Sequence, residues 1–141
     1  MARKRDTVAL LKQVPLFEGL SRRELEQIMK VAKEIDFDEG HAIVEEGATG
    51  VGFHLMLEGE ASVLVGGRKR ATLRSGDYFG EMSLIDGGPR SATVKTVTPV
   101  RTMALTSWAF LPLLDKSPSI AKKMLQEMSR RMRNLERSLT H

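Results

Sequence analysis

The most informative stretch of the chain reads Phe79-Gly80-Glu81-Met82-Ser83-Leu84-Ile85, followed closely by Pro89-Arg90-Ser91-Ala92-Thr93-Val94. Gly80 lets the backbone approach a ligand without a Cβ in the way, and the short apolar run after it can form a helical turn whose N–H groups point at an anion. Arg90 adds a permanently charged fork of donors that suits a phosphate, whereas Glu81 can accept hydrogen bonds from a sugar hydroxyl. The pattern predicts a small buried anion site for a ligand that carries both a phosphate ester and a hydroxyl group.

Length and composition indicate one globular domain over residues 1–141. The chain has 141 residues, 41% of them hydrophobic, which suffices for a single core. Its 22 Lys and Arg against 18 Asp and Glu give a formal charge of +4, which points only weakly to anionic partners. It has no cysteine, which excludes disulfides and Cys-based zinc sites. No run approaches the roughly 20 apolar residues of a membrane span, so we expect a soluble, cytoplasmic protein.

The N-terminal section, residues 6–35, has helical periodicity. Asp6 can cap a short helix that reaches Val14 and is stopped by Pro15. Ser21 and Glu24 have the spacing of a capping box, which predicts the start of a second helix.

The middle section, residues 35–105, changes to short apolar or alternating runs punctuated by glycine, which is typical of strands. The expected strands are His41–Val44, Phe53–Leu57, Ala61–Val65, Ala71–Leu73, Ala92–Val97 and Val100–Leu105. Gly66-Gly67 predicts a tight hairpin, and the recurring Gly40, Gly47, Gly59 and Gly76 mark further turns. We therefore predict an α+β, mainly β fold: an antiparallel, jelly-roll-like β-roll flanked by N-terminal helices and by a short and a long C-terminal helix.

The C-terminal section, residues 107–140, returns to helical periodicity. Ser107 is expected to cap a short helix ending near Asp115, and Ser117-Pro118 to open a long one. The long helix carries an apolar seam at alternating three- and four-residue steps, made of Leu125, Met128, Met132, Leu135 and Leu139. Such a seam either faces a partner helix in a homodimer or packs on the chain's own β-roll. The neighbouring arginines, Arg130, Arg131, Arg133 and Arg137, form a solvated face from which one arginine could reach a ligand.

Together these elements resemble the cyclic nucleotide-binding domain, the family of catabolite activator protein, the regulatory subunits of cyclic AMP-dependent kinase and cyclic nucleotide-gated channels. The resemblance rests on the cassette over residues 79–94 and on three weaker pieces: residues 14–21, Glu45-Glu46-Gly47 and Glu58-Gly59-Glu60. It implies a non-catalytic receptor module whose ligand is cyclic AMP, with cyclic GMP as the alternative. The module can be a whole regulatory protein or the sensor of a larger channel or regulator.

The resemblance also implies a role for each cassette residue. Glu81 would bind the ribose 2′-hydroxyl with help from the backbone of Gly80, and Arg90 would pair with the cyclic phosphate. The N–H of Ser83 and the hydroxyl and N–H of Ser91 would complete the phosphate site. Three further candidates for ligand contact are Met82 in the cassette and Val63 and Leu73 in the β-roll.

A simpler interpretation exists for two features of the cassette. Arg90 and Glu81 could form a surface ion pair of small energetic value, about 0–1 kcal/mol. Asp86-Gly87-Gly88 is expected to be a plain turn with no ligand role.

Base selection depends on two other positions. In the family that the chain resembles, a threonine directly after the cassette arginine accompanies a preference for cyclic GMP, and a serine or alanine more often accompanies cyclic AMP. Ser91 is therefore compatible with either base, and we favour cyclic AMP. Leu135 occupies the place where the catabolite activator protein pattern has a base-contacting threonine.

Other classes of function have little support. The three histidines, His41, His54 and His141, lack metal-ligand spacing, so a cupin-like metalloenzyme is not favoured and no metal or other cofactor is expected. The serines lack a Gly-x-Ser-x-Gly elbow. DNA binding is not expected either, because the chain ends at His141 before a helix-turn-helix of the activator type could follow.

Overall fold

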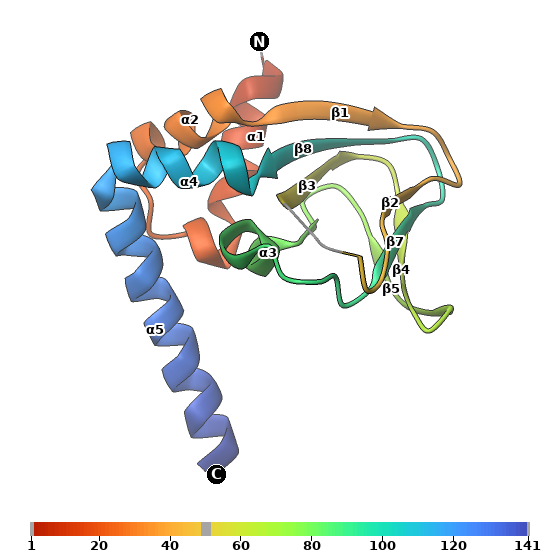
Figure 1. Cartoon of the computed structure of the whole chain (residues 1–141). Helices are drawn as coiled ribbons and strands as arrows, with labels where there is room; N and C mark the ends of the chain where they lie inside the picture. Colours follow the sequence, from red (N-terminus) through yellow and green to blue (C-terminus); the bar gives the residue numbers. More distant parts are fainter. Residues whose placement is uncertain (1, 49–51, 141) are drawn as a thin grey trace.

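Two antiparallel four-stranded sheets face each other in this computed structural model, which describes residues 2–48 and 52–140 (Figure 1). The first sheet has the order β1 (Lys33–Phe37), β8 (Val100–Thr106), β3 (Gly52–Glu58) and β6 (Tyr78–Phe79). The second has the order β2 (Ala42–Val44), β7 (Thr93–Thr96), β4 (Ala61–Val65) and β5 (Arg68–Leu73). The α+β, mainly β architecture with an antiparallel β-roll is confirmed, and six strands lie where the glycine-punctuated runs predict them, within a few residues.

The hairpin between β4 and β5 turns at Gly66-Gly67, as the sequence predicts. Both glycines have positive φ, 58° and 78°, which is what a two-residue turn with the twist of a β-hairpin requires. The glycines at 40, 47, 59 and 76 also have positive φ.

The strands β3 and β8 of the first sheet are buried on both faces, which divides the core in two. Alternate residues of β3 and β8 point away from the roll, and Phe53, Leu55 and Leu105 pack there against the helices. Their neighbours point into the roll, where Met56 and Val100 meet Ala61 and Val94 of the second sheet. The strands β3 and β8 therefore separate the interior of the roll from the core that the helices cover.

Three N-terminal elements cover the outer face of the first sheet: α1 (Ala2–Lys12), the 3₁₀ helix η1 (Pro15–Phe17) and α2 (Arg22–Val31). The capping box of α2 is confirmed, because Ser21 and Glu24 each bond the other's backbone N–H. The predicted bounds of the first helix are wrong. It begins before Asp6 and ends at Lys12, because Val14 precedes Pro15 and takes an extended conformation.

The strand β1 corrects the predicted end of the helical section. Residues 33–35 belong to β1, not to a helix, because the segment pairs with β8 in a register that sets Ile35 opposite Thr102. The strand β6 was also missed, since it is only two residues long and lies at the start of the cassette.

Two helices end the chain, α4 (Ser107–Lys116) and α5 (Pro118–Thr140). The cap of α4 is Thr106, not Ser107: its Oγ1 accepts the N–H of Ala109 at 3.3 Å. No helix among residues 2–48 and 52–140 is long and apolar enough to cross a bilayer.

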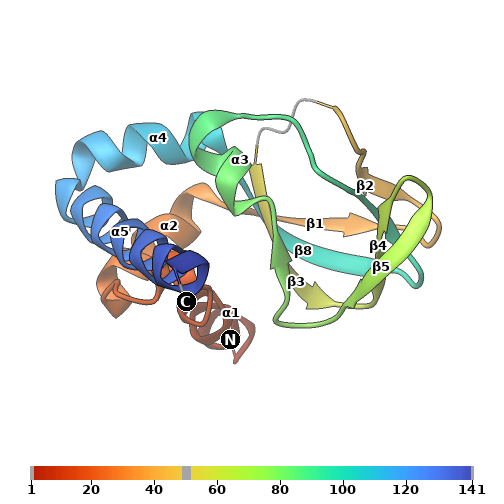
Figure 2. The same ribbon diagram turned by 90° about the horizontal axis from the view of Figure 1, so that it is seen from below.

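The long helix α5 begins beside α4 and η1 and extends away from the β-roll (Figure 1); seen from below, it lies on the side of the molecule opposite β4 and β5 (Figure 2). Ile120 and Met124 bury its inner face in the helical core. Its predicted seam points elsewhere: Leu125, Met128, Met132, Leu135 and Leu139 are 38% to 79% exposed. The alternative that this seam packs on the chain's own roll is therefore wrong.

Candidate functional site

A cavity of about 440 Å³ opens between the cassette and the second sheet. All eight residues that the sequence singles out line it, namely Val63, Leu73, Gly80, Glu81, Met82, Ser83, Arg90 and Ser91. The rest of its wall consists of Val44, Tyr78, Phe79, Asp86, Gly88, Pro89, Ala92 and Val94. A volume of this size lies in the range of small-molecule sites.

The cassette begins at β6, which is hydrogen-bonded to β3 and aligns Phe79 with His54. Gly80 then caps α3 (Glu81–Asp86), and Gly87 ends the helix in the left-handed conformation. The hydroxyl of Ser83 donates to the carbonyl oxygen of Gly88 at 3.3 Å, so the start of α3 is tied to the segment that leads to Arg90.

Gly80 sits where no other residue fits. Its φ is 84°, in the left-handed region, and a Cβ added there would overlap Nη1 of Arg90 and the carbonyl oxygen of Gly52. The close approach of the cassette to Arg90 therefore depends on this glycine.

Arg90 is held by its backbone and by its side chain. Its N–H donates to Ala48 at 2.9 Å and its carbonyl accepts from Gly47 at 2.8 Å, which pins it to the segment after β2. The side chain is only 8% exposed, and Nη2 donates to the carbonyl oxygen of Gly52 at 2.6 Å. Burial lowers the pKa of the guanidinium, although an arginine stays charged in proteins. Among the described residues, its buried Nε has no hydrogen-bond partner.

Glu81 is half-buried at the start of α3. Burial raises the pKa of its carboxyl group, and the positive charge of Arg131 on α5 opposes that rise. In the part of the chain that the structure describes, Glu81 makes no ion pair with Arg90, so the surface-pair interpretation of these two residues is wrong. A buried cation and a partly desolvated carboxylate instead stand on the wall of the same cavity.

The second sheet supplies apolar side chains to the wall of the same cavity. Val63 of β4 pairs with Val94 of β7, and Leu73 of β5 pairs with Ala61, so all four side chains share the inner face of that sheet. Met82 lies at the rim and is 78% exposed.

Sequence reasoning missed several members of the wall. Asp86-Gly87-Gly88 is a turn, as expected, with Asp86 Oδ1 accepting the Gly88 N–H at 2.8 Å, but Asp86 and Gly88 also line the cavity. Tyr78 lines it too, and burial together with Glu81 raises the pKa of its phenol. The tyrosine lies directly before the cassette, which is the signal that could have found it. Leu135 does not belong to the described cavity wall.

His54 occupies the roll interior behind the cassette. Its ring stacks on Phe79 at 5.0 Å, and Nδ1 lies 3.0 Å from Thr102 Oγ1. Burial and the nearby charge of Arg90 lower the pKa of His54 from 6.5 to about 4. The described residues contain no cluster of three His, Asp or Glu side chains able to hold a metal ion.

The fold and the cassette of this chain have counterparts in a known protein family. The model of the family described as cyclic nucleotide-binding domain matches residues 34–117. The chain belongs to the cyclic nucleotide-binding domain family.

Two curated relatives illustrate the range of regulators that carry this domain. A cAMP-dependent protein kinase regulatory subunit from Aspergillus fumigatus is 36% identical over 124 residues, which cover 86% of this chain and 30% of the subunit. A CRP-like cAMP-activated global transcriptional regulator from Mycobacterium tuberculosis is 27% identical over 135 residues, which cover 92% of this chain and 60% of the regulator. The chain thus spans less than two thirds of the length of either relative.

Solved structures show the same fold. The N-terminal domain of a transcriptional regulator from Streptomyces coelicolor superposes with a TM-score of 0.85 at 26% identity, covering 92% of this chain and 94% of that domain. The catabolite activator protein of Thermus thermophilus gives a TM-score of 0.70 at 30% identity, covering 89% of this chain and 62% of that protein.

Proposed function

We propose that the cavity binds a cyclic nucleotide, cyclic AMP in preference to cyclic GMP, and that the protein is a non-catalytic receptor module. The observation that carries this proposal is Arg90, a buried arginine with an unpartnered Nε, in the wall of a cavity that also contains a half-buried carboxylate. An unpaired buried cation is costly, and a phosphate that enters the cavity would supply the missing acceptor.

The other residues then have complementary roles. Ionised Glu81 accepts the ribose 2′-hydroxyl beside Gly80, while the N–H of Ser83 and the exposed Ser91 complete the phosphate site. Val63, Leu73 and Met82 offer apolar surface to the rest of the ligand. Charged and apolar groups thus line the same cavity, as an amphipathic nucleotide requires.

Titration calorimetry with cyclic AMP, cyclic GMP and linear AMP tests the ligand. We expect cyclic AMP to bind more tightly than cyclic GMP. Linear AMP should bind weakly, because its phosphate is not tied to the sugar in a ring and must be ordered on binding to reach Arg90 while the ribose reaches Glu81. Equal affinity for linear AMP, or no binding of either cyclic nucleotide at millimolar concentration, would refute the proposal.

The proposed output is a displacement of the C-terminal helices. A ligand whose phosphate pulls the cassette inward changes the contacts of α3 with α4, and the segment from Leu105 to Ser117 can transmit that change to α5. Hydrogen exchange with and without ligand measures it: protection should change in α4 and α5 as well as in the cassette. A response confined to the cassette would contradict this output.

A homodimer through α5 is the second part of the proposal, and the observation that favours it is the exposed seam. Leu125, Met128, Met132, Leu135 and Leu139 recur at the spacing of a two-helix contact, and none of them is buried. Sedimentation equilibrium should show a dimer that Met132→Glu dissociates, whereas Arg133→Glu, a control one residue along, should not do so. A wild-type monomer at high concentration would refute the dimer.

A further inference from the structure

A second cavity, of about 520 Å³, opens between β2 of the second sheet and β1, β3 and β8 of the first. In the described part of the chain, only Val44 and Arg90 line both this cavity and the cassette cavity. Other residues proposed for the cyclic nucleotide, Glu81 and Ser83 among them, are absent from its described wall. The proposed function therefore does not account for this space.

The sizes of the inward-facing side chains explain why the roll is hollow at this end. Met56 of β3 and Val100 of β8 fill the interior near the second sheet. Because side chains alternate along a strand, residues four positions away face the same side, and these are Gly52 on β3 and Ala104 on β8. A glycine and an alanine leave open the volume that larger side chains occupy elsewhere in the interior. The cavity is therefore a consequence of small residues at two inward-facing positions.

Apolar residues make up most of the cavity wall. Ile35 of β1 and Ile43 of β2 line it from the two sheets, and Ile35 is 37% exposed although it lies opposite the fully buried Thr102. Removing such apolar surface from water is favourable, so the apolar body of a ligand would be stabilised here. The charged residues of the described wall are Glu45, which is exposed, and Arg90, which already bonds a backbone carbonyl. A ligand of this cavity therefore needs no charge of its own.

His54 supplies an oriented polar group to this wall. Its Nδ1 lies 3.0 Å from Oγ1 of Thr102, which leaves Nε2 available to a ligand. The stack on Phe79, at 5.0 Å between ring centroids, holds the plane of the imidazole. Because its pKa is lowered to about 4, His54 is uncharged at neutral pH, and Nε2 then either donates or accepts one hydrogen bond. A largely apolar cavity with a few placed hydrogen-bonding groups is typical of small-molecule sites.

We propose that the second cavity binds a small, uncharged and mainly apolar molecule that carries one hydroxyl or N–H group. Ile35, Ile43 and Ala104 contact its apolar body, and Nε2 of His54 bonds its polar group. The inference goes beyond the cyclic nucleotide site and does not depend on it, because the residues that carry it belong to the second wall alone.

Methyl NMR with 4-fluorophenol tests the proposal on the full chain. This probe has one ring and one hydroxyl, and it is uncharged at neutral pH because a phenol has a pKa of about 10. With carbon-13-labelled methyl groups of isoleucine, leucine, valine and alanine, we expect saturable shifts at millimolar probe and NOEs to Ile35, Ile43 and Ala104. Val63, which lines only the cassette cavity, should give no NOE. Fluorobenzene lacks the hydroxyl and should bind more weakly, because it cannot bond His54.

A pair of matched substitutions distinguishes the two cavities. Ala104→Leu fills the second cavity and should abolish probe binding. It should change cyclic AMP affinity by less than about threefold, because Ala104 is not part of the described cassette wall. Ala92→Leu is the control, since Ala92 lines the cassette cavity and not the second one. It should weaken cyclic AMP binding and leave probe affinity unchanged.

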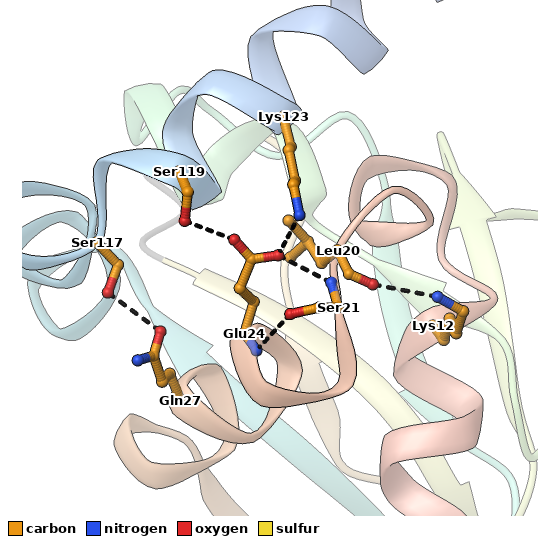
Figure 3. A network of polar contacts seen from close by, with 8 residues as sticks. All are labelled: Lys12, Leu20, Ser21, Glu24, Gln27, Ser117, Ser119 and Lys123. Atoms are coloured by element: carbon orange, nitrogen blue, oxygen red, sulfur yellow. Dashed lines mark hydrogen bonds and ion pairs between the residues drawn. The ribbon is translucent and has the colours of Figure 1, made fainter.

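Two further variants separate binding from stability. Ile35→Ser removes apolar surface on an edge strand and should weaken probe binding without unfolding the protein, so it decides the test if Ala104→Leu does not fold. Glu24→Gln weakens the contacts of a buried carboxylate with Ser119 and Lys123 among the helices (Figure 3). It lies in neither cavity wall, so it should lower the unfolding midpoint and leave probe affinity unchanged.

The absence of saturable shifts at millimolar probe would overturn the proposal, as would full probe affinity in a folded Ala104→Leu variant or in Ile35→Ser. NOEs confined to the leucines of the exposed α5 seam would also overturn it, because they would show non-specific association. Failure of cyclic nucleotides to bind would refute the proposed function but would leave the probe result standing.

Discussion

Arg90 donates from Nη2 to the backbone carbonyl oxygen of Gly52 at 2.6 Å, across the interior of the roll. The bond joins the end of the cassette to the first residue of β3. It leaves the guanidinium with a buried Nε that has no partner in the described part of the chain. Arg90 therefore links the cassette to the first sheet, and the proposed site requires that its remaining donors bind the ligand's phosphate.

Replacing this arginine should abolish tight binding. Arg90→Gln removes charge-assisted hydrogen bonds worth roughly 1.5–3 kcal/mol each, so we expect cyclic nucleotide affinity to fall about ten- to a thousandfold. Titration calorimetry measures the loss. Arg74→Gln is the control, since Arg74 is exposed and forms an ion pair with Glu60 at 3.8 Å. Wild-type affinity in Arg90→Gln would remove the basis of the proposed site.

Gly80→Ala should destabilise the fold more than a glycine substitution elsewhere. Alanine at φ 84° costs about 1–2 kcal/mol, and here its Cβ also collides with Arg90 and with the Gly52 carbonyl. Gly40→Ala is the matched control, because Gly40 has φ 74° but no atom within 4 Å of an added Cβ. Urea unfolding compares the two variants. If Gly80→Ala and Gly40→Ala lose the same unfolding free energy, the contact of the added Cβ with Arg90 and Gly52 costs nothing, contrary to this prediction.

Nucleotide affinity should fall as the solution is acidified toward the pKa of Glu81. Burial raises this pKa above its ordinary 4.5, so the carboxylate takes up a proton at a higher pH than an exposed glutamate does. The protonated acid is the weaker acceptor for a ribose hydroxyl. Calorimetry between about pH 8 and pH 5 measures the effect. Glu81→Gln should bind the nucleotide more weakly at neutral pH, and its affinity should no longer depend on pH in this range. If its affinity varies with pH as in the wild type, another group causes the pH dependence.

Stability should decline in acid through Glu24. Although burial alone would raise its pKa, hydrogen bonds from Lys123, Ser119 and Ser21 outweigh that effect and lower the pKa from 4.5 to about 2. A lowered pKa in the folded state means that the contribution is complete above pH 4.5 and is lost as the pH falls toward 2. We expect a loss of at most about 3 kcal/mol, measured by urea unfolding.

The matched variant isolates this contribution. Glu24→Gln should be less stable than the wild type at neutral pH, and the difference should shrink as the pH falls through the same interval. Glu26→Gln, on an exposed part of the same helix, should follow the wild-type curve. A constant difference at all pH values would mean that Glu24 is not ionised in the folded protein.

Local signals in the sequence predicted the elements that depend on local chemistry. Gly66-Gly67 predicted a hairpin, and Ser21 with Glu24 predicted a helix start. Ser117-Pro118 predicted the start of the long helix, and α5 begins at Pro118. The local motif grouped the cassette residues, the family resemblance added Val63 and Leu73 of the β-roll, and all eight candidates line one cavity. Predictions failed where a distant segment intervened: β1 exists because it pairs with β8, some 65 residues later, as Asp36 opposite Arg101 shows.

The sequence by itself determined the β-roll with flanking helices and the residues of the cassette, because glycine conformation, capping and alternation act over a few neighbouring positions. Only the tertiary structure decided that Arg90 is buried against Gly52, that the apolar seam of α5 is exposed, and that Glu24 is bonded to Lys123. Each of these depends on burial and on contacts between segments far apart in the chain, which no local pattern encodes.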